Sequence, residues 1–400
     1  MTVESLLASP AFQMSILLFV ALAGYLIAYR INQSAVVGII LAGILVGPSL
    51  LGLVTYTDFV SSLASLGAIV LLFTIGLEFQ LEEIAKPKYF FIALLGVIIP
   101  WIGGFFLAEA FNFDFKAAVF IGTALTATSI AVTANVLREM GKLQTNAARA
   151  IIGAAVVDDI LALLVLSLSE SIVSDTLAFL PIFITVVKAM GFIVLGIVIG
   201  KLFLGKLLVR FDNSKVAEKY PESIFIFAMM VAFFYSIAAE LVGLSAIVGS
   251  FLAGVAFESN RLRGRGSVFK EGAEHLQVIF ASIFFISLGV IMDLRVVTWN
   301  LLLFVLALTA VAMLTKVLGC GATAKVQGTS WRDSLIIGVG MVPRGEVAMI
   351  VSLIGLNQGL IQQDAYSALI LMSLLSTVIP PIILRNWLFR ERKPEHDPAG

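Results

Sequence analysis

Two adjacent aspartates, Asp158 and Asp159, lie in an otherwise apolar stretch, IIGAAVVDDILALLVLSL, at residues 151–168. A charged side chain at the centre of a bilayer costs about 2.5–3.5 kcal/mol on insertion scales. Two neighbouring carboxylates cost more, because each disfavours ionisation of the other. A chain keeps such a pair where the carboxylates have a function, so the pattern predicts an ion or proton site inside a membrane protein.

A third charge, Lys316, lies in the apolar run LTAVAMLTKVLGCGATA. A buried lysine needs a carboxylate partner or loses its proton. Because successive residues of a helix point about 100° apart, one aspartate can pair with Lys316 while the other faces a water-filled cavity. The second carboxylate can then take a hydrated alkali cation or a proton, and competition between them is sufficient for exchange. Hard oxygen ligands suit Na⁺ or Li⁺. The alternative, a structural Asp–Lys ion pair, explains only one aspartate.

Two further polar segments are predicted to interrupt helices. Residues 122–135, GTALTATSIAVTAN, are rich in hydroxyl side chains, which compete with the helix for backbone hydrogen bonds. Residues 338–349, GVGMVPRGEVAM, combine helix-weakening Gly and Pro with Arg344 and Glu346, two buried charges of opposite sign. An unwound stretch can turn both charges inward, where they bond each other or the facing segment. The alternative for each segment is a packing face of small residues.

The composition indicates a membrane protein. Hydrophobic residues make up 60% of the 400 residues and charged residues only 13%, against roughly 25% charged in soluble domains. A formal net charge of zero gives no footprint for nucleic acid. One cysteine and two histidines cannot form a zinc cluster, so the sequence predicts neither a cofactor nor an enzyme.

Apolar runs between charged or Pro/Gly/Asn breaks predict thirteen membrane-spanning helices, since about 20 apolar residues cross the hydrocarbon layer. They cover residues 11–30, 35–53, 60–77, 87–111, 115–137, 145–170, 178–209, 221–241, 243–258, 274–292, 297–322, 331–356 and 364–388. The chain is expected to be one transporter unit with a short cytoplasmic tail at 389–400.

Basic residues test this count through the positive-inside rule. With the N-terminus outside and the C-terminus inside, 21 of the 26 Lys and Arg fall in the inner connections. Only Lys116 and Arg295 fall outside, and Lys188, Lys316 and Arg344 lie within spans. The alternation supports thirteen spans in this orientation.

An internal repeat relates the two halves of the chain. SAVVGIILAG at 34–43 and SAIVGSFLAG at 245–254 match at seven of ten positions. FTIGLEFQL at 73–81 aligns with ISLGVIMDL at 286–294 at nearly the same offset. The matched spans are seven apart, so the halves at 11–170 and 221–388 are expected to be inverted, with 178–209 as a linker helix. Inverted repeats are typical of secondary transporters, whose sites lie near the midplane.

These motifs resemble the monovalent cation:proton antiporters, most closely the bacterial and archaeal sodium/proton antiporters of the NapA type. VVDDILAL, TALTATSIAVTANVL, FFISLGVIMDL, LTKVLG and MVPRGEVAMIV carry the resemblance, which runs from about residue 11 to 388. It implies an all-α fold with crossed discontinuous helices, a core domain, a dimerisation domain, a homodimer and a prokaryotic plasma membrane. It also implies outward Na⁺ for inward H⁺ by an elevator-like motion, with electrogenic exchange typical of members that carry both aspartates.

The resemblance also implies roles for individual residues. Asp159 would bind Na⁺ or a proton and Asp158 would pair with Lys316, while Thr128 and Ser129 would lie near the ion. A supporting network would consist of Thr126, Arg344 and Glu346. Potassium/proton antiport by the same site, a gated cation channel and a sodium-coupled symporter are the alternatives.

Overall fold

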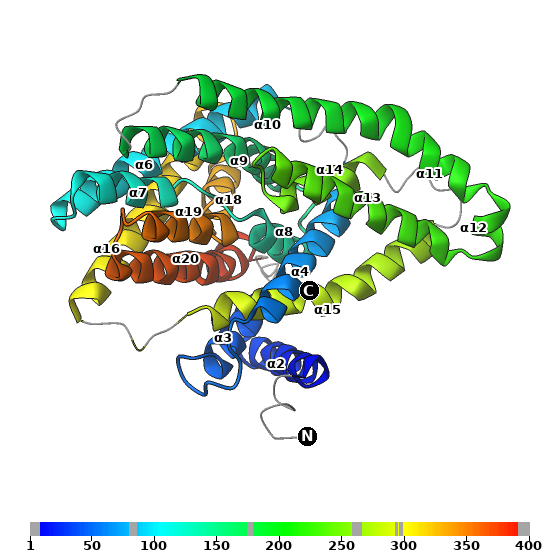
Figure 1. Cartoon of the computed structure of the whole chain (residues 1–400), viewed down its shortest axis with the longest axis horizontal. Coiled ribbons are helices and arrows are strands. Elements are labelled where there is room, and N and C mark those ends of the chain that lie inside the picture. Colours follow the sequence, from blue (N-terminus) through cyan, green and yellow to red (C-terminus); the bar gives the residue numbers. More distant parts are fainter. Residues whose placement is uncertain are drawn as a thin grey trace, which may run out of the picture.

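The computed structural model describes residues 9–79, 86–173, 179–257, 266–292, 295 and 299–390. Within these ranges all regular secondary structure is helical (Figure 1). Nine of the described helices are long and apolar enough to cross a membrane, and four shorter apolar helices of 10–17 residues accompany them. This matches the predicted class of an all-α polytopic membrane protein.

Six helices pack together as one group, called the scaffold group below. Its main contacts join α4 to α15 and α14, α3 to α15 and α2, and α13 to α14. The members are α2 (Pro10–Ile31), α3 (Ala35–Val46), α4 (Asp58–Gly76), α13 (Glu222–Leu241), α14 (Ala246–Phe257) and α15 (Gly266–Val290).

Seven helices form a second group, the core group, in which α6 contacts α7, α9 and α16, and α20 contacts α16 and α19. Figure 1 shows it on the left, beside the scaffold group. The members are α6 (Pro87–Ala110), α7 (Phe115–Ala124), α9 (Asn146–Val173), α16 (Trp299–Lys316), α18 (Trp331–Gly340), α19 (Glu346–Asn357) and α20 (Gln363–Ile383).

Among the elements that contact both groups are a short helix and a longer connection. The short helix α8 (Ile130–Glu139) contacts α9 and α20 in the core group and α3 and α4 in the scaffold group. The longer connection is α10 (Phe179–Ile199), a π-helical segment η1 (Gly200–Leu204) and α11 (Gly205–Asp212), which run along one edge of the molecule before α12 (Lys215–Lys219) (Figure 1).

Glycines bring the scaffold helices into close backbone contact. A Cβ added at Gly43 of α3 would lie 2.4 Å from the Ile286 carbonyl of α15, and one at Gly254 of α14 would lie 2.3 Å from the Phe73 carbonyl of α4. A side chain at either position would clash with main chain, so only glycine allows these approaches. Gly43 and Gly254 occupy the same position in the repeated decapeptide, and Phe73 and Ile286 begin the second repeated segment.

The predicted spans locate the helices, with two corrections to their ends. The span predicted at 35–53 is helical only over Ala35–Val46, because Gly47 is an extended C-cap and Pro48 follows it. The span predicted at 274–292 begins earlier, at Gly266, since its helix continues through polar residues that do not need apolar surroundings. Apolar length therefore locates a helix but does not fix where its backbone turns.

Candidate functional site

Two helices are interrupted in the core group where the sequence predicted. The first break, residues 125–129, separates α7 from α8, and the second, residues 341–345, separates α18 from α19. The breaks touch directly: the Ser129 N–H donates to the Pro343 carbonyl at 2.7 Å. An interrupted helix exposes backbone groups that have no partner in their own helix, and here each break supplies partners to the other.

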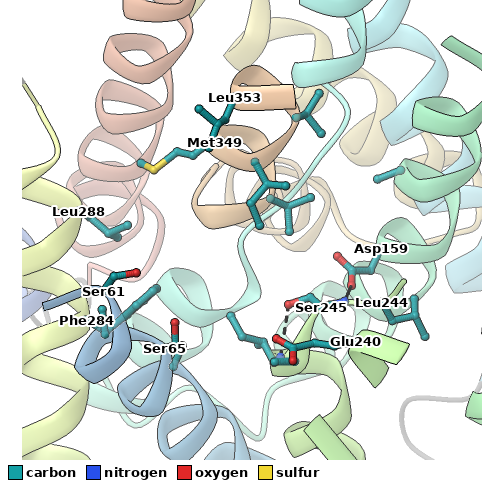
Figure 2. Close-up of a pocket in the computed structure, with 18 of the residues that line it drawn as sticks. Ser61, Ser65, Asp159, Glu240, Leu244, Ser245, Phe284, Leu288, Met349 and Leu353 are labelled. Carbon is teal, nitrogen blue, oxygen red and sulfur yellow. Dashed lines mark hydrogen bonds between the residues drawn. The ribbon is translucent and has the colours of Figure 1, made fainter. Parts of the chain in front are cut away.

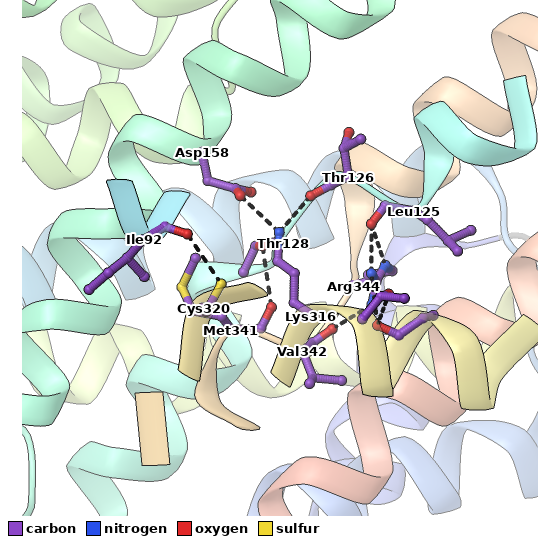
Figure 3. A network of polar contacts seen from close by, with 12 residues as sticks. Ile92, Leu125, Thr126, Thr128, Asp158, Lys316, Cys320, Met341, Val342 and Arg344 are labelled. Carbon is purple, nitrogen blue, oxygen red and sulfur yellow. Dashed lines mark hydrogen bonds and ion pairs between the residues drawn. The ribbon is translucent and has the colours of Figure 1, made fainter. Parts of the chain in front are cut away.

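The side-chain contacts between the breaks are reciprocal. The Thr128 hydroxyl donates to the Met341 carbonyl at 3.3 Å, and Arg344 donates to the Leu125 carbonyl through Nη2 at 2.6 Å and Nε at 3.2 Å. In each case the side chain of one break satisfies the last carbonyls of the helix that precedes the other. Arg344 is fully buried and also donates to the Val342 and Ala312 carbonyls (Figure 3).

Lys316 joins the first break to α9. Its Nζ donates to Asp158 Oδ1 at 2.8 Å and to the Thr126 carbonyl at 2.7 Å (Figure 3). The exposed fractions are 0% for the lysine and 1% for the aspartate. A buried ion pair of this kind is stable only when both charges are hydrogen-bonded. In Asp158 the bond to Lys316 is made by Oδ1, while Oδ2 has no hydrogen-bond partner among the described residues.

Lys316 stands at a change of helix geometry. It is the last residue of α16, and a π-helical segment, η4 (Val317–Ala322), follows before α17 (Thr323–Val326). Short π-helical segments occur frequently at functional sites. Gly96 of α6 leaves room beside it, because an added Cβ would lie 2.4 Å from Cys320 Sγ and 3.8 Å from Lys316 Nζ.

Asp159 has a different environment, as the turn between adjacent helical residues requires. It is 9% exposed and lines a cavity of about 620 Å³. Its Oδ2 accepts a hydrogen bond from the Ser245 backbone N–H, at 3.3 Å. The structure thus separates the two aspartates: one faces a buried lysine and the other faces a cavity.

The cavity lies between the two helix groups. Scaffold helices α4, α13, α14 and α15 and core helices α9, α19 and α20 all contribute to its wall. Among the residues that the structure describes, its charged lining consists of two carboxylates, Asp159 and Glu240 (Figure 2). The rest of the described wall is mainly apolar, with hydroxyl side chains at Tyr56, Ser61, Ser65, Ser245, Ser287 and Tyr366.

Glu240, at the end of the span predicted at 221–241, was not predicted as a site residue. Its side chain is exposed, but it shares the cavity with Asp159. Position along a span does not show which cavity a side chain enters. The nearby repeat motif beginning at Ser245 was the available signal, because it marked this corner of α13 and α14.

The other predicted site residues are distributed around the breaks. The Thr126 hydroxyl donates to the Thr123 carbonyl at 2.8 Å, so its contact with Lys316 is made by the backbone carbonyl. The Ser129 hydroxyl is buried and has no hydrogen-bond partner among the described residues. Glu346 was also predicted to belong to this network, but its side chain is outside the part of the molecule that the structure describes.

A second polar cluster lies at the end of α8. Arg138 Nε contacts Glu78, two residues after the end of α4, at 3.1 Å, and Nη2 contacts Glu274 of α15 at 3.2 Å. The neighbouring Glu139 accepts from the Ser34 hydroxyl at 2.6 Å and from the Ala35 N–H at 3.1 Å. These contacts tie α8 to three scaffold helices.

The geometry agrees with what comparison with known proteins shows. The family model described as "Sodium/hydrogen exchanger, transmembrane" matches residues 16–390. The chain belongs to the sodium/hydrogen exchanger family. Its relatives include the Na⁺/H⁺-K⁺ antiporter GerN of Bacillus cereus, 34% identical over 92% of this chain and 94% of the relative. Another is the Na⁺/H⁺ antiporter of Enterococcus hirae, 34% identical over 90% and 93%.

A solved structure shows the same exchanger fold. The sodium proton antiporter MjNhaP1 of Methanocaldococcus jannaschii superposes with a TM-score of 0.67 and covers 94% of this chain and 97% of its own. Its sequence identity is 16%, so this likeness concerns the fold alone. The family membership identifies the chain as a multi-pass membrane protein, in agreement with its apolar helices.

Proposed function

We propose that this chain is a secondary transporter that exchanges Na⁺ or Li⁺ for H⁺, with cation and proton competing at Asp159. The separation of the two aspartates carries the proposal. Asp158 is compensated by Lys316 at 2.8 Å, whereas Asp159 lines a cavity of about 620 Å³. The two relatives above, named as Na⁺/H⁺ and Na⁺/H⁺-K⁺ antiporters, support the same assignment.

The donor set around the break suits a hard cation. Carboxylate, hydroxyl and carbonyl oxygens are the ligands that such ions prefer. We assign ion binding to Asp159, with Asp158, Thr128 and Ser129 close to the path. We assign Thr126, Arg344 and Glu346 to a supporting network around the two breaks. The Ser129 hydroxyl supports its own assignment, because it has no hydrogen-bond partner in the described part of the chain and a buried hydroxyl without a partner is costly.

Transport then proceeds by alternating access. The core group carries the site and moves against the scaffold group, which forms the dimer contact of a homodimer in the plasma membrane. The cavity between the two groups supports this division, because a movement of one group past the other would close it on one side.

Thirteen spans in two inverted six-span repeats, with the N-terminus outside and the C-terminus inside, complete the proposed architecture. The glycine contacts support it. A Cβ added at Gly289 would lie 2.3 Å from the Ile40 carbonyl, and one added at Gly76 would lie 2.4 Å from the Phe251 carbonyl. These two contacts correspond to each other in the repeat, as the Gly43–Ile286 and Gly254–Phe73 contacts do. A pseudo-two-fold axis between the halves would generate both pairs.

Electrogenic exchange is the proposed stoichiometric class. Each net charge that moves down the membrane potential is worth about 2.3 kcal/mol per 100 mV. An electrogenic exchanger therefore expels Na⁺ even when the pH gradient is small. Potassium/proton exchange at the same site is the second candidate, favoured by the name of the GerN relative.

Purified protein in liposomes with an internal pH dye tests this function. Addition of Na⁺ or Li⁺ should drive proton movement, and an imposed potential of the correct sign should accelerate it. Asp159→Asn should abolish the response, whereas Glu109→Gln, which removes an exposed carboxylate on α6, should leave it intact. Proton movement with K⁺ alone would replace the sodium proposal with the potassium one, and full exchange by the Asp159 variant would show that the site is misplaced.

A further inference from the structure

The carboxylate of Asp159 contacts the residue that directly precedes a scaffold helix. Its Oδ2 accepts from the backbone N–H of Ser245, which directly precedes the 12-residue helix α14. The Ser245 hydroxyl accepts from the Ile247 N–H at 3.3 Å, so this residue also caps α14. Figure 2 shows Asp159 and Ser245 together at one end of the cavity. A carboxylate of one helix group therefore touches the N-terminus of a helix in the other.

The repeat provides an independent counterpart of this contact. Ser34 occupies the position of Ser245 in the repeated decapeptide and caps α3 through a 3.3 Å bond from the Val36 N–H. A carboxylate also lies at the N-terminus of α3: that of Glu139, which accepts hydrogen bonds from the Ser34 hydroxyl and the Ala35 N–H. Both repeat-related scaffold helices thus begin against a carboxylate that comes from outside the scaffold group.

The charge state of Asp159 decides how strong its contact is. A helix N-terminus carries partial positive charge and unpaired N–H groups, so it favours an ionised carboxylate. A carboxylate that has bound Na⁺ or a proton is neutralised and gains much less from it. The contact therefore distinguishes an empty, ionised Asp159 from a loaded one.

We propose that the Ser245 N–H is a positioning element that holds the empty core group against the scaffold and is released when a cation or proton neutralises Asp159. The inference rests on the proposed exchange at Asp159. An exchanger loses coupling if its site crosses the membrane empty, because one ion then moves without the other in return. A contact that is strong only in the empty, ionised state suppresses that step.

Two substitutions separate the N–H from the rest of the residue. Ser245→Pro removes the N–H and the capping hydroxyl, whereas Ser245→Ala removes the hydroxyl and keeps the N–H. In liposomes with a sodium isotope and an internal pH dye, we expect Ser245→Pro to carry Na⁺ with at least twofold fewer protons per Na⁺. Wild type and Ser245→Ala should keep the same ratio as each other.

Two outcomes would overturn the inference: a wild-type ratio in Ser245→Pro, or an equal loss in Ser245→Ala, which would assign the effect to the helix cap. Absence of exchange in the wild type would instead refute the proposed function. Amide hydrogen exchange in the wild type provides a test that does not depend on the folding of a variant. At one fixed alkaline pH, the Ser245 amide should exchange several-fold faster with Na⁺ than with choline, and equal rates would also refute the inference.

Discussion

The ion pair between Lys316 and Asp158 can be tested by removing its charges one at a time and together. Lys316→Met leaves a buried carboxylate without its counter-charge, and Asp158→Asn leaves a buried ammonium. Breaking a buried pair by removing one partner costs about 3–5 kcal/mol. Both groups are almost completely buried, with exposed fractions of 0% and 1%, so the full penalty applies to each single variant.

The double variant should lose much less than the sum of the two single ones. With both charges gone, the main remaining cost is the Thr126 carbonyl, which loses the hydrogen bond from Lys316. An unsatisfied buried acceptor costs about 1–3 kcal/mol. Two independent losses would add to about 6–10 kcal/mol, so we expect a coupling free energy of at least about 3 kcal/mol.

Denaturant titration in detergent micelles, followed by circular dichroism, measures these free energies of unfolding. Lys206→Met serves as the control, because Lys206 is exposed on α11 and surface substitutions usually change stability by less than about 0.5 kcal/mol. Losses that add to within about 0.5 kcal/mol would refute the reasoning, since independent sites behave in that way.

Two further predictions concern the scaffold and the cavity. Gly254→Ala should destabilise the protein by about 1–3 kcal/mol, because the added Cβ would lie 2.3 Å from the Phe73 carbonyl. In the same titration the control Gly191→Ala on α10, where an added Cβ meets no atom within 4 Å, should stabilise the protein by about 0.5–1 kcal/mol. Equal effects of the two substitutions would contradict the proposed close packing. Glu240→Gln should raise the apparent KM for Na⁺ about two- to fivefold at low ionic strength, because a cavity lined by one sign of charge concentrates the opposite ion. The difference in KM between wild type and variant should shrink in 0.15 M choline chloride, where the Debye length falls to about 8 Å. A difference in KM that does not change with salt would exclude steering by charge.

The sequence predicts the helices and breaks of this fold more reliably than the contacts between them. Hydroxyl-rich residues near Thr128 and the Pro343–Gly345 region marked the two breaks, because these residue types weaken a helix wherever it lies. That one of the two aspartates pairs with Lys316 followed from the need of a buried lysine for a carboxylate partner, and the family resemblance implied that this aspartate is Asp158. Neither argument needs knowledge of the tertiary structure.

Contacts between distant surfaces were not predictable in this way. The Ser245 backbone N–H carries no side-chain signature, so its bond to Asp159 appears only when the fold brings the start of α14 to α9. Glu240 looked like an ordinary residue at the end of a span, although it shares the cavity of the aspartate. Predicted helix ends were wrong for a local reason. At Gly47, for example, the backbone geometry ends the helix before the apolar run is finished.

The reciprocal bonds between the two breaks also bear on synthesis. Thr128 reaches a carbonyl 213 residues further along the chain, and Arg344 reaches one 219 residues back. At about 5–20 residues per second, the second break leaves the ribosome roughly 10–40 s after the first. During that interval the Leu125 carbonyl lacks its native guanidinium partner. The hydrogen bonds of the first break are therefore incomplete while the first half of the chain is in the membrane, and they are completed when the last third of the chain is added.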